Sequence, residues 1–181
     1  VFKFLHLPVQ SGDDEVLKRM NRFYSEEDFR EIVQAFRAKI PSITLATDVI
    51  CGFPDETPEA FKRTVELIKK TETDIVNISK FFPRPHTPAE KMERLPPEEV
   101  RERSGKLAEL CKEISFKKNQ AWTNWAGKIL VDEKGKKASS WMGRNFAYKT
   151  IVIKSGEFLL GKSVKVCVMK TFPTYLEAEI V

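Results

Sequence analysis

Residues 47–57, Thr-Asp-Val-Ile-Cys-Gly-Phe-Pro-Asp-Glu-Thr, decide how this chain is interpreted. The apolar run that begins at Ile43 leads into them as a buried strand, which ends at Gly52. Thr57 then caps a helix that has Pro58 at its first position. Such a unit places polar residues at the carboxyl end of a strand, where α/β sheets and barrels bind ligands. An ordinary strand–turn–helix corner is the competing interpretation, and the neighbouring segments decide between the two.

Strands and helices alternate on both sides of this unit. The sequence predicts buried strands at residues 2–8 and 74–82, and amphipathic helices at 13–20, 25–40 and 58–70. Crossovers of that length imply that the three strands pair in parallel. Three parallel strands would leave bare edges, which natural sheets avoid. We therefore expect the second half of a larger α/β barrel, and hence a fragment of a longer protein.

The last third of the chain has a different period. From about Gln120, apolar and polar residues alternate, and residues 132–135 (Asp-Glu-Lys-Gly) are predicted to form a hairpin turn. The expected strands are residues 128–131, 149–153, 163–169 and 175–181. Four or five strands in 60 residues make a small antiparallel β-barrel.

These patterns predict three parts: residues 1–96, a connecting helix at 97–119, and the barrel at 120–181. The barrel segment carries the whole net charge of +5, because it holds ten Lys and Arg against five Asp and Glu. A small basic domain indicates a polyanionic partner. No run of 18 apolar residues predicts a membrane span, and no signal peptide is visible at the first residues.

Basic and aromatic residues interleave near the start of the barrel segment. This combination suits single-stranded RNA, because the charges bind phosphates and the rings stack on bases. A solvated lysine turn beside core aromatics is the competing interpretation. The candidate RNA-binding residues are Lys134, Lys136, Lys137, Trp141, Arg144, Phe146 and Lys149.

The cysteines give no metal-binding pattern. Cys51, Cys111 and Cys167 lie far apart in the sequence, and only His6 and His86 could join them. Zinc and iron–sulfur sites require closely spaced ligands, so no metal ligand is predicted. Three buried thiols in a reducing compartment are expected instead.

Three motifs together resemble the radical-SAM tRNA methylthiotransferases. They are residues 6–17 (His-Leu-Pro-Val-Gln-Ser-Gly-Asp-Asp-Glu-Val-Leu), residues 47–57, and residues 82–89 (Phe-Pro-Arg-Pro-His-Thr-Pro-Ala). The C-terminal 60 residues resemble the TRAM RNA-binding domain that ends those enzymes. Asp55 and His86 stand where the family usually has glycine. The added side chains could change the local backbone conformation of both turns.

The resemblance implies a fold, a reaction and its partners. The fold is half of a partial radical-SAM (β/α) barrel followed by a TRAM domain, which is OB-like. The wording of the motifs is most similar to the archaeal and eukaryotic branch, which methylthiolates N6-threonylcarbamoyladenosine at position 37 of tRNA. The full-length enzyme would use S-adenosylmethionine and two 4Fe–4S clusters in the cytoplasm. This chain lacks the cluster-binding half, so we expect it to bind no cluster, to be inactive alone, and to self-associate through its truncated barrel.

The resemblance also implies a site at the strand ends, with no catalytic side chain assigned. The candidate cofactor-binding residues are Gln10, Ser11, Asp48, Ile50, Gly52, Phe81 and Phe82. Arg84, on a proline-stiffened loop, is a candidate for holding a phosphate or the threonyl carboxylate of the substrate. Two alternatives stay open: the related reaction on an aspartate of a ribosomal protein, and a non-catalytic RNA-binding module.

Overall fold

The computed structural model of the chain describes all 181 residues and contains two compact units. The α/β unit consists of residues 5–41 and 45–111, and the barrel unit consists of residues 1–4, 42–44 and 112–181. None of the helices is long and apolar enough to span a membrane.

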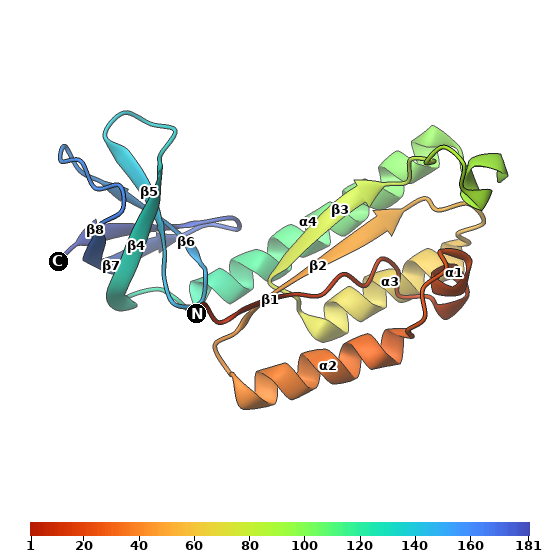
Figure 1. Cartoon of the computed structure of the whole chain (residues 1–181), viewed down its shortest axis with the longest axis horizontal. Coiled ribbons are helices and arrows are strands. Elements are labelled where there is room, and N and C mark those ends of the chain that lie inside the picture. Colours follow the sequence, from red (N-terminus) through yellow and green to blue (C-terminus); the bar gives the residue numbers. More distant parts are fainter. The chain divides into compact units, whose positions relative to one another are not determined.

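A three-stranded sheet forms the centre of the α/β unit (Figure 1). Its strands are β1 (Phe4–His6), β2 (Thr44–Cys51) and β3 (Ile75–Lys80), in the order β1-β2-β3. β2 and β3 pair in parallel, as the crossover lengths predict. β1 is shorter than the predicted strand at residues 2–8, and an isolated parallel bridge between Gln10 and Val49 continues the pairing beyond it.

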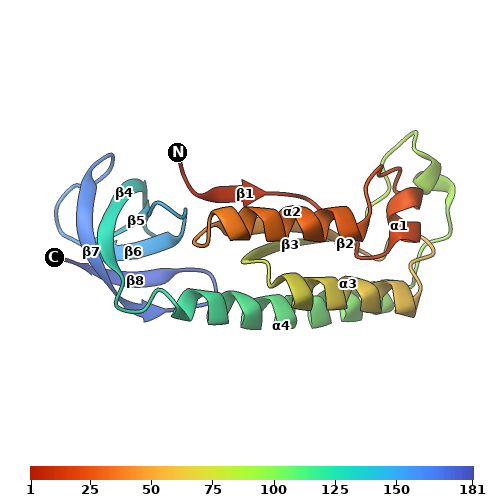
Figure 2. The ribbon, with the colours of Figure 1, turned by 90° about the horizontal axis from the view of Figure 1, so that it is seen from below.

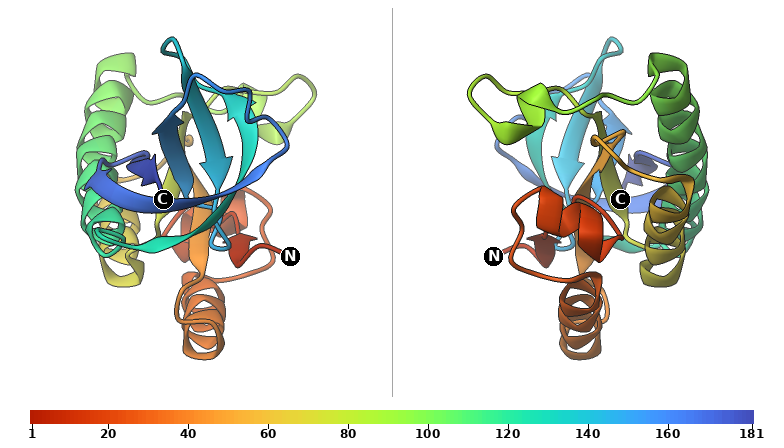
Figure 3. Two further views of the ribbon diagram at one scale, coloured as in Figure 1. Left: turned by 90° about the vertical axis from the view of Figure 1, so that its left-hand side faces the viewer. Right: turned by 90° about the vertical axis from the view of Figure 1, so that its right-hand side faces the viewer.

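Helices α2 (Glu26–Lys39) and α3 (Pro58–Thr71) begin where their capping residues predict. The other helices are α1 (Asp14–Arg19), α4 (Pro97–Gln120) and the short 3₁₀ helix η1 (Pro88–Lys91). Ser25 and Asp28 form a capping box at α2, and Thr57 accepts a hydrogen bond from the Ala60 amide at α3. α2 and α3 run along the strands, and Figures 2 and 3 show both on one face of the sheet.

The two faces of the sheet differ in chemistry. Leu45, Val49 and Cys51 of β2 are buried, as expected for the face against the helices. Asp48 and Ile50 alternate with them and are only half-buried, beside exposed residues of β3. The helix-covered face therefore supplies the core, and the opposite face carries polar groups toward solvent.

The barrel unit contains five strands that close on themselves. They are β4 (Ala126–Lys134), β5 (Ser140–Arg144), β6 (Thr150–Lys154), β7 (Ser163–Thr171) and β8 (Leu176–Ile180), in the order β4-β5-β6-β8-β7. All neighbouring pairs are antiparallel except β6 and β8, which run parallel. The interior is apolar, with Val131, Ile151, Val166 and Leu176 completely buried. The predicted fold class, part of an α/β barrel followed by a small OB-like β-barrel, is confirmed.

One local prediction in the barrel is wrong, and one strand has no counterpart among the predictions. Residues 132–134 belong to β4 rather than to a hairpin turn, because a register shift between Val131 and Glu133 lets the strand continue past its apolar part. The turn follows at Gly135. The sequence also gave no separate prediction for β5, because its residues Ser-Trp-Met-Gly-Arg do not alternate clearly between apolar and polar.

Candidate functional site

The main chain at Gln10 is held in register with β2 at the strand ends. The Gln10 amide donates to the Asp48 carbonyl (2.8 Å), and the Gln10 carbonyl accepts from the Ile50 amide (2.9 Å). Gln10 has a φ of 68°, a conformation that a residue other than glycine adopts at some cost. Gln10 and Ile50, both candidate cofactor residues, are therefore brought side by side.

The turn after β2 is built around a buried carboxylate. The Gly52 amide donates to Oε2 of Glu56 (3.0 Å), and Nη1 of Arg103 donates to the same oxygen (2.7 Å). Both charged side chains are almost fully buried. Burial raises the pKa of Glu56, while the hydrogen bonds from Arg103 and Gly52 oppose that rise. A Cβ at Gly52 would lie within 2.5 Å of Val100 in α4, so the turn requires glycine.

This arrangement affects what Gly52 can offer a ligand. Its amide already donates to Glu56, so it is not a free donor at the strand end. Nearby, Asp55 has a φ of 61°, and His86 in the proline-rich loop has a φ of 65°. Both residues thus take the left-handed backbone that glycine adopts readily. The turns keep a glycine-like geometry although the side chains are larger.

A polar network occupies the open face of the sheet. Oδ1 of Asp48 lies 2.9 Å from Nε2 of His6 and accepts a hydrogen bond from the side-chain Nδ2 of Asn77 (2.8 Å). The three residues come from three neighbouring strands. Asp48 is thereby fixed as an acceptor close to the carboxyl ends of the strands.

The remaining candidates at the strand ends differ in exposure. Ser11 is buried, and its hydroxyl lies between Thr64 and the Asp13 amide. The Phe81 ring packs edge-on against Phe53, with centroids 5.2 Å apart, while Phe82 is 82% exposed. Ser11 and Phe81 therefore contribute to packing, and Phe82 is available at the surface.

Arg84 projects from an exposed loop after β3. Its carbonyl accepts hydrogen bonds from the amide and the hydroxyl of Thr87, which turn the loop toward η1. The guanidinium is exposed and thus available to an anionic group.

The cysteines do not fit an iron–sulfur cluster. Burial raises the pKa of Cys51 to about 12 and that of Cys111 to about 11, whereas cluster ligands are thiolates. Cys167 lies in the barrel. No group of three His, Cys, Asp or Glu side chains in the chain is arranged to hold a metal ion. The residues present therefore do not provide a cluster site.

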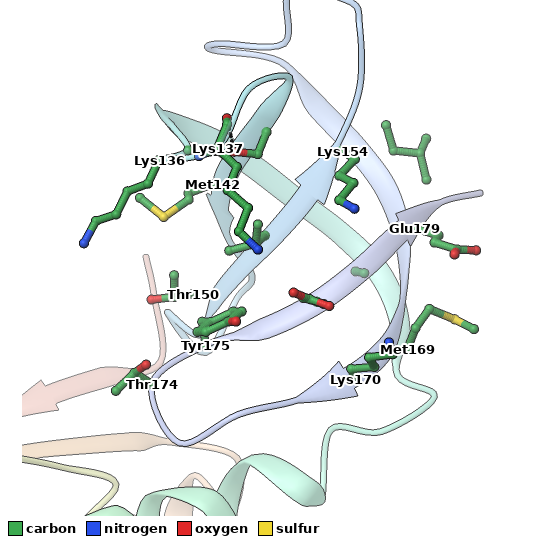
Figure 4. A pocket seen from close by; sticks show the side chains of 16 residues that line it. Lys136, Lys137, Met142, Thr150, Lys154, Met169, Lys170, Thr174, Tyr175 and Glu179 are labelled. Atoms are coloured by element: carbon green, nitrogen blue, oxygen red, sulfur yellow. Dashed lines mark hydrogen bonds between the residues drawn. The ribbon is translucent and has the colours of Figure 1, made fainter.

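A groove of about 860 Å³ lies on the outer face of the barrel (Figure 4). It extends over β5, β6 and β8, with the β4–β5 turn at one border and the β7–β8 loop at another. OB-type barrels bind oligonucleotides on the equivalent strands and loops. The lysines that line the groove are Lys136, Lys137, Lys154 and Lys170, and its apolar and aromatic side chains include Met142, Val152, Met169 and Tyr175.

Only part of the predicted RNA-binding set converges on this groove. Lys136 and Lys137 line it, and Lys134 is exposed on β4 without lining it. Trp141 is 8% exposed and belongs to the barrel core, and the exposed Phe158 packs edge-on against its ring, with centroids 5.3 Å apart. Its ring is therefore a core group that offers no free face to a base.

The other predicted RNA-binding residues belong to a separate cluster in the same unit. Arg144 lies 3.4 Å from the Asp132 carboxylate and stacks over the Tyr148 ring, while Lys149 is buried. Phe146 lies beneath the ammonium of Lys3 (5.2 Å), and its carbonyl accepts from the Lys3 amide. Phe146 thus holds Lys3 of the N-terminal segment against the barrel, and Arg144 has partners within the barrel itself.

Sequence reasoning missed several residues of the groove. Thr150 and Lys154 lie on β6 at alternate positions of one face, and Tyr175 precedes β8. The residues of β6 that face the groove could have been identified from the alternation along this strand. Thr150, Val152 and Lys154 alternate there with the buried Ile151 and Ile153. Their convergence depends on the β5–β6–β8 order, which the sequence pattern does not determine.

Comparison with known proteins defines the class. Residues 2–68 match the Radical SAM superfamily, and residues 128–181 match the TRAM domain. A solved radical-SAM enzyme, coproporphyrinogen III oxidase (HemN) from Escherichia coli, has a similar fold, with a TM-score of 0.53 and 18% identity. The similarity covers 93% of this chain and 41% of that enzyme. The chain therefore combines part of a radical-SAM fold with a TRAM domain.

The relatives are named for methylthio modifications of two different tRNA adenosines. The chain is 44% identical, over all of its residues, to a probable threonylcarbamoyladenosine tRNA methylthiotransferase from Pyrococcus horikoshii. It is 39% identical to the threonylcarbamoyladenosine tRNA methylthiotransferase of Drosophila melanogaster, over 92% of the chain. A tRNA-2-methylthio-N(6)-dimethylallyladenosine synthase from Petrotoga mobilis is 37% identical over 98% of the chain. The chain spans 42%, 30% and 41% of the lengths of these relatives.

Proposed function

We propose that the chain is the C-terminal part of a radical-SAM methylthiotransferase that converts N6-threonylcarbamoyladenosine in tRNA to its 2-methylthio derivative. The observation that carries this proposal is the similarity to the Pyrococcus relative, which extends without interruption over both units. A non-catalytic RNA-binding module would need only the barrel, so similarity across the α/β unit favours the enzyme. The relatives described above give no support to the reaction on a ribosomal protein.

The chemistry would depend on groups supplied outside these 181 residues. Such an enzyme uses S-adenosylmethionine and two 4Fe–4S clusters to generate a radical and to provide sulfur and methyl groups. The thiols of this chain do not fit cluster ligation, so the ligands would come from another part of the full-length protein. This chain alone is then expected to be inactive.

The strand ends would form one wall of the reaction site. The Gln10 side chain and the fixed carboxylate of Asp48 could orient the cofactor, Ile50 could lie against its adenine, and the exposed Phe82 ring could flank that adenine. The guanidinium of Arg84 could hold a phosphate or the threonyl carboxylate by paired hydrogen bonds. Ser11, Gly52 and Phe81 would act indirectly, by fixing the backbone.

The barrel would bind the tRNA, which also implies a cytoplasmic enzyme. Four lysines around one groove favour a polyanionic ligand, and the adjoining Tyr175 favours nucleic acid among polyanions. Self-association through the edge strands β1 and β3 is expected for this chain by itself, because unpaired edges recruit other strands.

The test measures nucleosides in tRNA. The full-length gene that encodes this chain is expressed in cells that make N6-threonylcarbamoyladenosine but lack its methylthiotransferase. Mass spectrometry should then detect 2-methylthio-N6-threonylcarbamoyladenosine. A methylthiolated dimethylallyladenosine instead would overturn the substrate assignment, and the absence of any methylthiolated nucleoside with well-expressed protein would overturn the activity.

Variants of Arg84 test the strand-end site. Arg84→Lys keeps the charge and loses the paired hydrogen bonds, so product should fall while tRNA binding is retained. Lys91→Ala, an exposed basic residue of η1, is the control and should leave product unchanged. Unchanged product in Arg84→Ala would remove Arg84 from the site.

A further inference from the structure

The groove of the barrel contains two acidic residues among its lysines, Glu177 and Glu179, of which Glu177 is the less exposed. Strand register aligns Met142 of β5 with Val152 of β6, and Val152 with Glu177 of β8. These three side chains therefore form one row across the outer face. Glu177 is half-buried, lines the groove and is paired in strand register with Lys170 of β7; Lys170 and Lys154 of the same lining are labelled in Figure 4. A phosphate would be repelled from this position, so the groove is not simply a phosphate cradle.

Tyr175 stands at the end of the groove next to this row. Its ring is stacked on Phe172, with centroids 4.5 Å apart and an angle of 12° between the planes. Tyr175 lines the groove and Phe172 does not. One face of the tyrosine ring is thus covered by Phe172, and a flat ligand entering the groove can extend the stack on the other face.

The loop that carries both rings is held by hydrogen bonds. The Phe172 amide donates to the Tyr175 carbonyl (2.9 Å), and the side chain of Asn119 donates to the carbonyls of Phe172 and Pro173 (2.8 and 3.1 Å). Asn119 is itself buried. The stacking surface is therefore ordered before any ligand arrives, which reduces the entropy cost of binding.

Glu177 and Tyr175 both line the groove, and Tyr175 directly precedes β8, which begins at Leu176. Two residues apart in nearly extended chain correspond to a separation of about 7 Å. A base stacked on Tyr175 can thus present its edge to the carboxylate. An ionised carboxylate only accepts hydrogen bonds, so it favours the exocyclic amino group of cytosine or adenine over the carbonyl of uracil.

We propose that this groove is a one-base subsite for single-stranded RNA, in which Tyr175 stacks on the base and Glu177 accepts a hydrogen bond from its amino group. Lys137 and Lys154 hold the flanking phosphates. The proposal deepens the RNA-binding role of the barrel and rests on that proposed function. It adds a preference for amino-bearing bases, which a purely basic surface would lack.

The test compares two ligands of equal charge. Binding of fluorescently labelled octacytidylate and octauridylate to the whole chain is measured by anisotropy at neutral pH and fixed salt. The cytidine oligomer should bind about tenfold more tightly, the effect of one hydrogen bond to a charged acceptor. Glu177→Gln should reduce that ratio to near one. Glu157→Gln removes the same charge from an exposed residue of the same unit outside the groove lining, and should leave the ratio unchanged.

Changes at the ring test the stacking. Tyr175→Leu should weaken both oligomers about tenfold with the same salt dependence, and Tyr175→Phe should retain affinity because the ring face is kept. Equal affinity of the wild type for the two oligomers, or a ratio that survives Glu177→Gln, would overturn the subsite. The absence of any salt-dependent RNA binding would instead refute the RNA-binding role of the barrel.

Discussion

The two units support their candidate functional surfaces by different means. In the barrel, the core is apolar and the charged residues of the groove stand on the outside of strands that are paired on both sides. In the α/β unit, the turn after β2 depends on the buried pair Glu56–Arg103. Surface charges can change without disturbing the fold beneath them, whereas a buried charge cannot lose its partner at low cost. Substitutions should therefore affect binding in the barrel and stability in the α/β unit.

The largest effect is expected from Arg103→Leu. This change leaves the Glu56 carboxylate buried without its partner, which should lower the free energy of unfolding by about 3–5 kcal/mol. Urea denaturation followed by circular dichroism measures the difference. Lys106→Leu on the same helix is the control, because Lys106 pairs with Glu102 at the surface and its loss should leave the midpoint unchanged. Equal effects of the two changes on the free energy of unfolding would show that the buried pair does not stabilise the α/β unit.

The cost of Arg103→Leu should also depend on pH. The folded pKa of Glu56 lies above its ordinary value of 4.5, and removing Arg103 takes away the main opposing contribution. A carboxyl with a raised folded pKa binds protons more readily in the folded state, so the stability of the variant should fall as pH rises above about 4.5. Denaturation of variant and wild type across the acid-to-neutral range gives this slope. The double variant Arg103→Leu/Glu56→Gln should lose it.

A smaller loss is expected from Gly12→Ala. A Cβ at Gly12 would lie 2.6 Å from the Cα of Thr64 and 2.8 Å from the carbonyl oxygen of Arg63, both backbone atoms of α3. The backbone must shift to relieve this contact, at a cost of about 1–3 kcal/mol. Thermal denaturation measures the loss. A variant as stable as the wild type would mean that α1 and α3 can separate freely at this point.

The groove lysines provide the corresponding test in the barrel. Replacing Lys136, Lys137 and Lys154 by alanine should reduce the slope of log affinity against log salt by about 2, because three phosphate contacts on a single strand are lost. The stability of the chain should not change. The matched control replaces Lys128, Lys162 and Lys165, three lysines of the same unit outside the groove lining. An equal loss in both triple variants would mean that RNA binds by diffuse charge rather than in the groove.

The smallest effect is a gain in stability. Gly105 lies exposed in the interior of α4, and a Cβ there would meet no atom within 4 Å. Gly105→Ala should therefore stabilise the chain by about 1 kcal/mol through helix propensity alone. Comparison with Gly12→Ala separates the effect of packing on stability from the effect of helix propensity. The same substitution should destabilise the chain at position 12 and stabilise it at position 105.

The sequence predicted the α/β unit better than the barrel for a physical reason. Its helices have strong local signals, such as the Ser25–Asp28 capping box and the Thr57-Pro58 start, and the crossover lengths determine parallel pairing. In the barrel, Trp141 lies in a basic, aromatic stretch of sequence. Such a stretch fits an RNA-binding surface as well as it fits a strand of the core. The set of lysines that line the groove depends on the pairing of β6 with β8. These two strands are separated in the sequence by β7. The buried Glu56–Arg103 pair likewise joins residues that no local pattern connects.

Closure of the barrel has a consequence beyond this chain. In a five-stranded barrel in which each strand has two partners, no backbone edge is left to recruit a foreign strand. Such a domain can be appended to unrelated enzymes without adding a template for aggregation, and its candidate ligand groove lies on its own strands and loops. Portability of this kind would allow one RNA-binding barrel to serve catalytic cores that otherwise have nothing in common.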